Sequence, residues 1–413
     1  MKLFWLLIYN LSLRLYIASI HFSAIFIIKA RKWVTGRKGW KHKLLNANPE
    51  KKSLIWMHCA SLGEYEQGKP VWEALRQAHK SSFFLLTFFS PSGFEAKKTD
   101  PLADLVLYLP ADTKANARYF IEWANPVLVL MVKYELWYHY ISELTERKIK
   151  TVLIAAVFRP KQWFFYFPGK FFMEKLRQLS HIFVQDEASL KLLHSHRVHN
   201  VSVAYDTRFD RVVEIASEKW NISAIDEFCH DAFLIVAGST WLEDEKLLAK
   251  NLLILPEKAK LILAPHEVNI RHLTQIKSLF KHAILFSKWD SKKRDDASIL
   301  IIDRMGILSK LYRYADLAYI GGGFGRSVHN VLEAAVYGIP LIFGPKHKKS
   351  LEALELLELN AALTVNNQRS FKAALRKYSN EDERMNAGRK ANQYIMNHIG
   401  GTEQITRFLL SDS

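Results

Sequence analysis

The sequence predicts an α/β protein built from two Rossmann-like, doubly wound domains that face each other across a cleft. Short apolar segments typical of buried strands alternate with amphipathic segments typical of helices, in two successive series. Glycines and polar residues follow these strands at their carboxyl ends, where open α/β sheets bind ligands. A basic and apolar segment precedes both series and is expected to form a membrane-associated helix.

Composition narrows the class of partner. The chain has 413 residues, 49% of them hydrophobic, which is enough for two large cores. It carries 58 basic against 41 acidic residues, a formal charge of +17, so anionic molecules are the favoured partners. Cys59 and Cys229 are the two cysteines, which excludes a disulfide framework and a cysteine-based metal site.

Residues 1–45 are expected to form a basic amphipathic segment on a membrane surface. The apolar run at 3–28 is interrupted by Asn10, Arg14 and His21, whereas a spanning helix needs about 20 apolar residues. Basic residues surround the run, and such a collar suits a cytoplasmic membrane surface. The alternatives are a core helix of the first domain and a single span. A secretory signal is not expected, because no small-residue cleavage site follows.

The two strand–helix series define the domain boundaries. The first occupies residues 46–210 and contains about six apolar strands, and the second occupies 231–385. Residues 211–230 between them are polar and lack strand character, so we expect a hinge or linker there. Residues 386–413 are expected to be helical and to pack back on the first domain. No tandem repeat, heptad array or DNA-binding signature is found, and nucleic acid is not an expected partner.

The stretch at 301–345 carries the clearest signal for a ligand site. An apolar strand at 317–320 ends in three glycines at 321–323, and a helix is expected to open at Asn330. A glycine turn before a helix is typical of anion sites, because backbone N–H groups can approach a phosphate closely there. Glu333, one turn into the helix, is placed to accept hydrogen bonds from a ribose diol. The alternative is that the three glycines only form a sharp turn between strand and helix and bind no ligand.

Three charged residues are candidates for chemistry. Glu64 follows the strand at 54–59, at the start of a helix, where a carboxylate can act as general base on a hydroxyl. Glu135 follows the buried strand at 127–132, and Arg208 lies beside the hinge, where a cation could reach a leaving phosphate. Each has a structural alternative. Glu64 could merely complement the helix dipole, Glu135 could cap a helix or pair with Lys133, and Arg208 could be a solvated surface cation.

Metal chemistry is not expected from the sequence. It contains no Asp-x-Asp of the kind that holds a divalent ion on a nucleotide diphosphate, and no His-x-x-x-His on a convincing helix. With a nucleotide-sugar donor, protein cations and helix N-termini would have to neutralise the leaving phosphate. A donor with one phosphate, or a metal-free site, is therefore favoured.

Several separate blocks resemble the 3-deoxy-D-manno-octulosonic acid (Kdo) transferases, which have the two-domain glycosyltransferase architecture called GT-B. The resemblance rests chiefly on residues 56–70, 134–137 and 301–345, and it extends in order over almost the whole chain. It implies an inverting, metal-independent enzyme that moves Kdo from CMP-Kdo to the 6′-hydroxyl of lipid A precursor (lipid IVA). That reaction belongs to lipopolysaccharide biosynthesis at the cytoplasmic side of the inner membrane of Gram-negative bacteria.

The resemblance also implies roles for individual residues. Glu64 matches the catalytic base, and Glu135 and Arg208 match positions that stabilise the transition state. The segments that match CMP-contacting residues comprise Pro265, His266, Met305, Gly306, Ile307, Asn330, Val331, Leu332 and Glu333. The first domain would bind the acceptor and the second CMP-Kdo. No cofactor, metal or protein partner is implied.

Departures from the family pattern concern the donor side and one strand end. His266 stands where the family usually has Arg, and a neutral imidazole is a weaker phosphate partner than a bidentate guanidinium. Arg271 or Arg326 could supply the missing charge. Lys133 stands in a motif where the family commonly has another Glu. Two alternative functions stay open: a GT-B transferase that uses a different nucleotide sugar on a membrane lipid, and a non-catalytic basic membrane protein.

Overall fold

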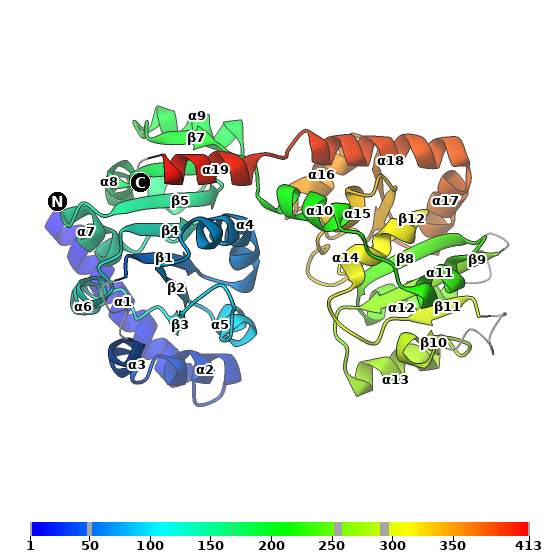
Figure 1. The fold of residues 1–413 in the computed structure, drawn as a ribbon, viewed down its shortest axis with the longest axis horizontal. Helices are drawn as coiled ribbons and strands as arrows, with labels where there is room; N and C mark the ends of the chain where they lie inside the picture. The colour runs from blue at the N-terminus through cyan, green and yellow to red at the C-terminus, as the bar shows by residue number, and fades with distance from the viewer. Residues whose placement is uncertain (1, 48–51, 168, 252–257, 290–296, 412–413) are drawn as a thin grey trace. The chain divides into compact units, whose positions relative to one another are not determined.

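The chain folds into two compact units, each with its own parallel sheet (Figure 1). The computed structural model describes residues 2–47, 52–167, 169–251, 258–289 and 297–411. Unit 1 comprises Met1–Asp210 and Ile399–Ser413, and unit 2 comprises Arg211–His398. The predicted class of two parallel-sheet α/β domains is confirmed.

The sheet of unit 1 has the strand order β3-β2-β1-β4-β5-β6-β7, with every neighbouring pair parallel. The order turns back between β1 and β4, and the carboxyl ends of two such strands form the switch point where α/β sheets bind ligands. The strands are β1 (Leu54–Cys59), β2 (Phe83–Phe88), β3 (Leu105–Tyr108), β4 (Leu128–Val132), β5 (Lys150–Ala156), β6 (His181–Val184) and β7 (Val201–Val203).

Helices cover both faces of this sheet, so its central strands are buried on both sides. Alternate residues enter two cores: Trp56 and Val129 lie in one, and Ile55 and Leu130 in the other. The covering helices are α4 (Leu62–Ala78), α5 (Pro91–Lys97), α6 (Lys114–Ala124), α7 (Tyr138–Glu146), α8 (Phe171–Gln178), α9 (Glu187–Ser195) and α19 (Gly401–Leu410), with the 3-10 turn η1 (Trp163–Phe165).

Three helices precede the sheet: α1 (Lys2–Ser23), α2 (Ile28–Gly36) and α3 (Trp40–Ala47). The Tyr9 hydroxyl donates to the buried Asp112 carboxylate, which ties α1 to unit 1. One turn of α1 also meets α7, where the Asn10 amide oxygen lies 2.7 Å from Nε2 of His139. In the described part of the chain no single helix is both long and apolar enough to cross a membrane. The helical segments Phe4–Ser23 and Ile28–Gly36 are long and apolar enough only when they are taken together, and the chain bends by 119° between them.

The sheet of unit 2 has the order β10-β11-β9-β8-β12-β13-β14, also with all neighbouring pairs parallel. Its order turns back between β8 and β12, so this unit has a switch point of its own. The strands are β8 (Phe233–Thr240), β9 (Ala259–Pro265), β10 (Ile284–Leu285), β11 (Ile299–Ile301), β12 (Leu317–Ile320), β13 (Leu341–Phe343) and β14 (Ala362–Thr364).

Helices of unit 2 are short around the switch point and longer at the end of the chain. They are α10 (Arg208–Ser217, which begins in unit 1), α11 (Ser223–Cys229), α12 (Leu242–Lys250), α13 (Ile270–Leu279), α14 (Leu308–Leu311), α15 (Leu332–Ala335), α16 (Leu351–Glu358), α17 (Gln368–Ser379) and α18 (Glu381–Met396). Two 3-10 turns, η3 (Phe286–Lys288) and η5 (Tyr312–Tyr314), complete the unit.

Two segments differ from the sequence prediction. The polar stretch at 211–230 is largely helical, because buried apolar residues such as Val212 and Phe228 give α10 and α11 one core-facing side each. The segment at 386–413 is two helices rather than one. The chain breaks at Gly400, whose φ of 99° favours glycine, so α18 stays in unit 2 and only α19 joins unit 1.

We predict that Asp112→Ala destabilises the protein by roughly 1–3 kcal/mol, the cost of leaving buried donors without an acceptor. Asp112 accepts the backbone N–H groups of His139 (3.1 Å) and Tyr140 (3.0 Å) at the start of α7, besides the Tyr9 hydroxyl. Urea unfolding measures the loss. Tyr9→Phe removes one of these hydrogen bonds and should cost less; equal losses for the two variants would contradict this account of α7.

Candidate functional site

Glu64 lies in the first turn of α4, directly after β1. The Ser61 side chain caps the helix by accepting the Glu64 N–H, and the Glu64 carboxylate accepts the N–H of Ala60. Burial and, after it, the negative charge of Glu135 raise the pKa of Glu64 to about 7, against the opposing effect of the backbone N–H groups and Lys133. A carboxylate that only capped the helix would have its pKa lowered. Glu64 is thus suited to accept a proton near neutral pH.

Glu135 follows β4 at the same sheet edge and is 8% exposed. Its Oε2 atom accepts the indole N–H of Trp137 (2.7 Å) and lies 2.9 Å from Nε2 of His58. Glu135 is therefore in contact with Trp137 and His58, whereas the sequence suggested Lys133 as a partner. Because β1 pairs with β4, the two glutamates are held at neighbouring strand ends.

Arg208 is not the solvated cation of the structural alternative. Its guanidinium donates from Nε (2.9 Å) and Nη2 (2.7 Å) to Asp206, a buried carboxylate that also accepts from Gln67 (2.6 Å). Burial alone would raise the pKa of Asp206, but the charge and hydrogen bonds of Arg208 hold it below its usual value. Gln67 lies one turn after Glu64 on α4. Arg208 is thus linked to the helix that carries the candidate base.

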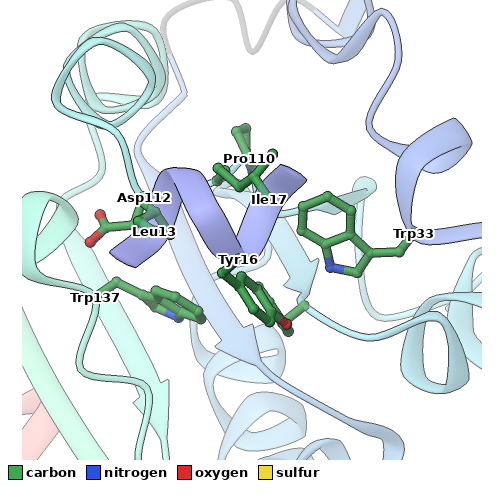
Figure 2. A pocket seen from close by; sticks show the side chains of 9 residues that line it. Leu13, Tyr16, Ile17, Trp33, Pro110, Asp112 and Trp137 are labelled. Carbon is green, nitrogen blue, oxygen red and sulfur yellow. The ribbon is translucent and has the colours of Figure 1, made fainter. Parts of the chain in front are cut away.

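An apolar pocket lies beside Glu135, between α1 and the strand ends. Trp137, the residue that donates to Glu135, stacks on Phe89 with 4.9 Å between the ring centroids. Figure 2 shows the Tyr16 ring of α1 between Trp137 and Trp33. An adjoining pocket of about 230 Å³ shares the wall at Trp33. It is lined by Ile17, His21, Trp33, Val34, Arg37, Lys38, Trp40, Pro110, Ala111 and Asn116. Apolar and cationic side chains therefore lie close together in these two adjoining pockets, and Trp137 in the wall of the first contacts Glu135.

In unit 2 the glycine turn after β12 differs from the expected phosphate cradle. The Gly321 N–H donates to the Gly238 carbonyl (2.9 Å), and the Gly322 N–H donates to the Asp244 carboxylate (2.9 Å). Gly322 has a φ of 88°, and a Cβ on Gly323 would lie 2.6 Å from the Gly344 backbone. The expectation that a phosphate accepts hydrogen bonds from this turn is therefore wrong for the N–H groups of Gly321 and Gly322, because both donate to acceptors within the protein. The glycines serve a left-handed turn and close backbone packing.

The predicted donor-contacting residues nevertheless share one edge of the unit 2 sheet. They follow β9, β11 and β12, which lie within four adjacent strands of that sheet. Asn330 donates from Nδ2 to Glu333 (3.0 Å) and accepts the Leu332 N–H (3.2 Å). The helix expected to run from Asn330 is the four-residue α15. The side chains of Val331 and Leu332 are buried in the core, so only their backbone could contact a ligand.

The other predicted donor residues lie in turns at this edge. Pro265 ends β9, Met305 is 68% exposed, and Gly306 has a φ of 89° just before Ile307. Arg271 and Arg326, the two cations considered as compensation for His266, are both exposed.

A stack of three rings adds to this edge. His266 lies on His329 with 4.3 Å between ring centroids, and the Trp241 indole N–H donates to Nε2 of His329 (3.0 Å). Burial lowers the pKa of both histidines, and for His329 the neighbouring His266 lowers it further, to about 4. Both rings are therefore neutral near pH 7. The sequence did not single out Trp241, because no local pattern places it against residues so far along the chain.

The fold is that of a GT-B protein. The structure is similar to UDP-GlcNAc 2-epimerase from Neisseria meningitidis bound to UDP-GlcNAc, with a TM-score of 0.58 and 15% identity over 87% of this chain and all (100%) of that one. It is also similar to Acinetobacter baumannii MurG, with a TM-score of 0.55 and 12% identity over 87% of this chain and 100% of that chain. At such identities the likeness concerns the fold alone.

Sequence relatives are more specific. Residues 36–211 match the family described as 3-deoxy-D-manno-octulosonic-acid transferase (kdotransferase). Kdo transferases of Aquifex aeolicus and Chlamydia trachomatis serovar A are 28% and 26% identical. These matches cover 75% and 87% of this chain, and 81% and 85% of those proteins. A bifunctional glycosyltransferase/methyltransferase of Fusobacterium nucleatum is 24% identical over 85% of this chain, which spans 57% of that protein's length. The predicted resemblance is confirmed: the chain is a glycosyltransferase related to the Kdo transferases.

We predict that Glu64→Gln weakens the loss of stability with rising pH. The folded-state pKa of Glu64, about 7, lies above its ordinary value of 4.5. Its stabilising contribution is therefore complete below 4.5 and is lost as the pH rises through 7. Thermal unfolding midpoints at about pH 5 and about pH 8 should differ less in the variant than in the wild type. Glu66→Gln, on the same helix, is the control and should match the wild type. An unchanged difference in Glu64→Gln would show that the pKa is not raised.

Proposed function

We propose that this protein transfers Kdo from CMP-Kdo to the 6′-hydroxyl of a lipid A precursor (lipid IVA), with inversion and without a metal. One observation carries the proposal: a carboxyl group with a pKa near neutrality, Glu64, lies at the sheet switch point of the unit that matches the Kdo transferase family. The relationship to Kdo transferases supports the sugar and the place in lipopolysaccharide biosynthesis.

In the proposed reaction Glu64 removes the proton of the acceptor hydroxyl. The hydroxyl oxygen forms a bond to the anomeric carbon of Kdo as the bond to the phosphate oxygen of CMP breaks. CMP leaves with the electron pair, and attack from the opposite face inverts the anomeric centre. The charge of Glu135 makes Glu64 a stronger base, and Arg208 stabilises the negative charge that develops in the transition state.

The donor would bind at the carboxyl edge of the unit 2 sheet. His266 and His329 offer neutral ring N–H groups, and Arg271 at the start of α13 and Arg326 in the turn after β12 are exposed cations. Glu333, held by Asn330, is placed to accept hydrogen bonds from a ribose diol. The absence of an Asp-x-Asp sequence supports a metal-independent reaction, and CMP-Kdo presents a single phosphate to this edge.

The acceptor side favours a phosphorylated amphiphile at a membrane surface. The apolar pocket at Trp137 adjoins the pocket lined by Lys38 and His21, so acyl chains and phosphates would both find partners there. Along α1 the apolar side chains of Phe4, Leu7, Leu11, Leu15 and Phe22 are exposed, and so are Trp163, Tyr166 and Phe167 of a second segment. We place the enzyme on the cytoplasmic side of the inner membrane, with neither nucleic acid nor a protein as partner.

The reaction predicts a measurable product. Purified protein with CMP-Kdo and tetraacyl lipid A precursor, in detergent with EDTA, should give a Kdo-sized mass increase by mass spectrometry. Glu64→Gln should lower the rate by about 10²–10⁴-fold, the usual contribution of a general base. Glu66→Gln is the matched control and should stay active.

Other outcomes of this assay separate the alternatives. Transfer from a UDP-sugar but not from CMP-Kdo would indicate a different GT-B transferase. Transfer that stops in EDTA would overturn the metal-free mechanism. No transfer from any nucleotide sugar, with lipid binding intact, would favour the non-catalytic membrane protein. Equal rates for Glu64→Gln and wild type would remove Glu64 from the role of base.

The membrane proposal predicts that Leu7→Asp with Leu11→Asp weakens binding to vesicles of phosphatidylethanolamine and phosphatidylglycerol by more than roughly tenfold, because both side chains would otherwise enter the lipid. Both are about 60% exposed on α1. Co-sedimentation measures binding. Ile270→Asp, at an 87% exposed position of unit 2, is the control and should bind like the wild type. Equal binding by the α1 variant would place the contact elsewhere.

A further inference from the structure

We propose that Trp241 is a positioning residue for the donor: it fixes the tautomer of His329, so that this ring offers a neutral Nδ1–H to a phosphate oxygen of the nucleotide. The proposal rests on the proposed function, in which CMP-Kdo binds at the carboxyl edge of the unit 2 sheet. It also concerns a departure from the family pattern, because His266, which packs on both rings, stands where an arginine is usual.

The hydrogen bond between Trp241 and His329 spans the switch point of unit 2. Trp241 directly follows β8, and His329 lies in the loop after β12; the strand order of the sheet turns back between these two strands. The indole Nε1 lies 3.0 Å from Nε2 of His329, and the two ring planes are inclined by 21°. The pair therefore lies at the place where an open α/β sheet binds its ligand.

The chemistry of the two rings fixes the direction of this hydrogen bond. An indole nitrogen can only donate, so Nε2 of His329 is the acceptor and carries no proton. Burial and the neighbouring His266 lower the pKa of His329 to about 4, so the ring is neutral near pH 7. A neutral imidazole with a bare Nε2 carries its proton on Nδ1. Trp241 thus selects the Nδ1–H tautomer of His329.

The other edge of the His329 ring is left for a ligand. A Cβ on Gly322 would lie 2.7 Å from Cδ2 and 2.9 Å from Nε2 of His329, so this glycine leaves room for the edge that accepts from Trp241. Nδ1 lies across the ring from that edge, and within the described residues it has no hydrogen-bond partner. The side chain is only half-buried. An N–H donor is therefore available at the switch point.

His266 supports the pair from one face. Its ring centroid lies 4.3 Å from that of His329 and 4.8 Å from that of Trp241, with ring planes inclined by 18° and 32°. Three rings packed in this way hold the Nδ1–H of His329 in one orientation before a ligand arrives. An N–H that donates to a phosphate oxygen makes a charge-assisted hydrogen bond, and this replaces part of what the usual guanidinium supplies.

The tautomer can be measured without substrate. In protein labelled with ¹⁵N-histidine, the signals of His329 are those lost in His329→Gln, and they should show a protonated Nδ1 and a bare Nε2. Trp241→Phe keeps a ring in the stack but removes the N–H, so the proton should redistribute between both nitrogens. Trp220→Phe, beside Tyr314 just before β12, is the matched control and should leave the tautomer unchanged. A bare Nδ1 in the wild type would overturn the proposal.

CMP binding tests whether the Nδ1–H meets the nucleotide. His329→Asn places an amide nitrogen where Nδ1 stands, one bond beyond Cγ, and should bind CMP nearly as well as the wild type. His329→Gln places its amide near the position of Nε2 and so loses the donor. It should bind CMP roughly tenfold more weakly, the weight of a hydrogen bond to a charged group. Isothermal titration calorimetry measures both, and equal affinities of the two variants would overturn the proposal.

A double-variant comparison separates positioning from packing. In the wild-type background Trp241→Phe should weaken CMP binding by at least roughly twofold, because only part of the His329 population then carries its proton on Nδ1. In the His329→Asn background the same change should cost nothing, since an amide has no tautomer to fix. Equal losses in both backgrounds would make Trp241 a packing residue and overturn the proposal.

The same variants separate this inference from the proposed reaction. A wild type that binds CMP, with the expected order of affinities among its variants, but transfers no Kdo would uphold the role of Trp241 and reject the reaction. Kdo transfer with the same KM for CMP-Kdo in the wild type and His329→Gln would uphold the reaction and overturn the inference.

Discussion

The parallel pairing of β1 with β4 is the constraint on which the candidate site depends. It brings the residues after both strands to one sheet edge, and so sets the Glu64 and Glu135 carboxylates close enough for their charges to interact. Two partly buried like charges repel each other, so the arrangement persists only because N–H donors stabilise each carboxylate. Ala60 supplies one for Glu64, and Trp137 supplies one for Glu135, whose Oε2 also lies 2.9 Å from Nε2 of His58. The pKa of Glu64 stays raised because burial and the charge of Glu135 outweigh these donors.

Much of this arrangement could be predicted because parallel sheets leave a simple trace in sequence. Strands buried on both faces read as continuous apolar runs, and the polar residue that follows each run falls at the carboxyl edge. Glu64 and Glu135 were found in that way. His58 and Trp241 could not be found, since their roles depend on neighbours in other strands or distant turns: Thr87 for His58, and His329 for Trp241.

The glycine turn of unit 2 shows why a turn can be predicted correctly while its binding partner is predicted wrongly. A missing Cβ allows either a phosphate or another backbone to approach, and the sequence is the same in both cases. Here Gly323 packs against Gly344, and the Gly322 N–H is occupied by Asp244. Burial raises the pKa of Asp244 even though that carboxyl also accepts the Tyr319 hydroxyl. The interior of the unit, and not a ligand, accounts for these glycines.

Helix α4 joins the chemistry of unit 1 to the two segments through which the chain passes between the units. Glu64 opens this helix, and Gln67, one turn later, donates to the Asp206 carboxylate that holds Arg208 just before the first crossing. At the second crossing, the adjacent Asp210 accepts the N–H groups of Gly400 (2.6 Å) and Thr402 (2.7 Å), and α19 then packs against α4. The position of α4, the helix that carries Glu64, therefore depends on contacts with both segments at which the chain crosses between the units.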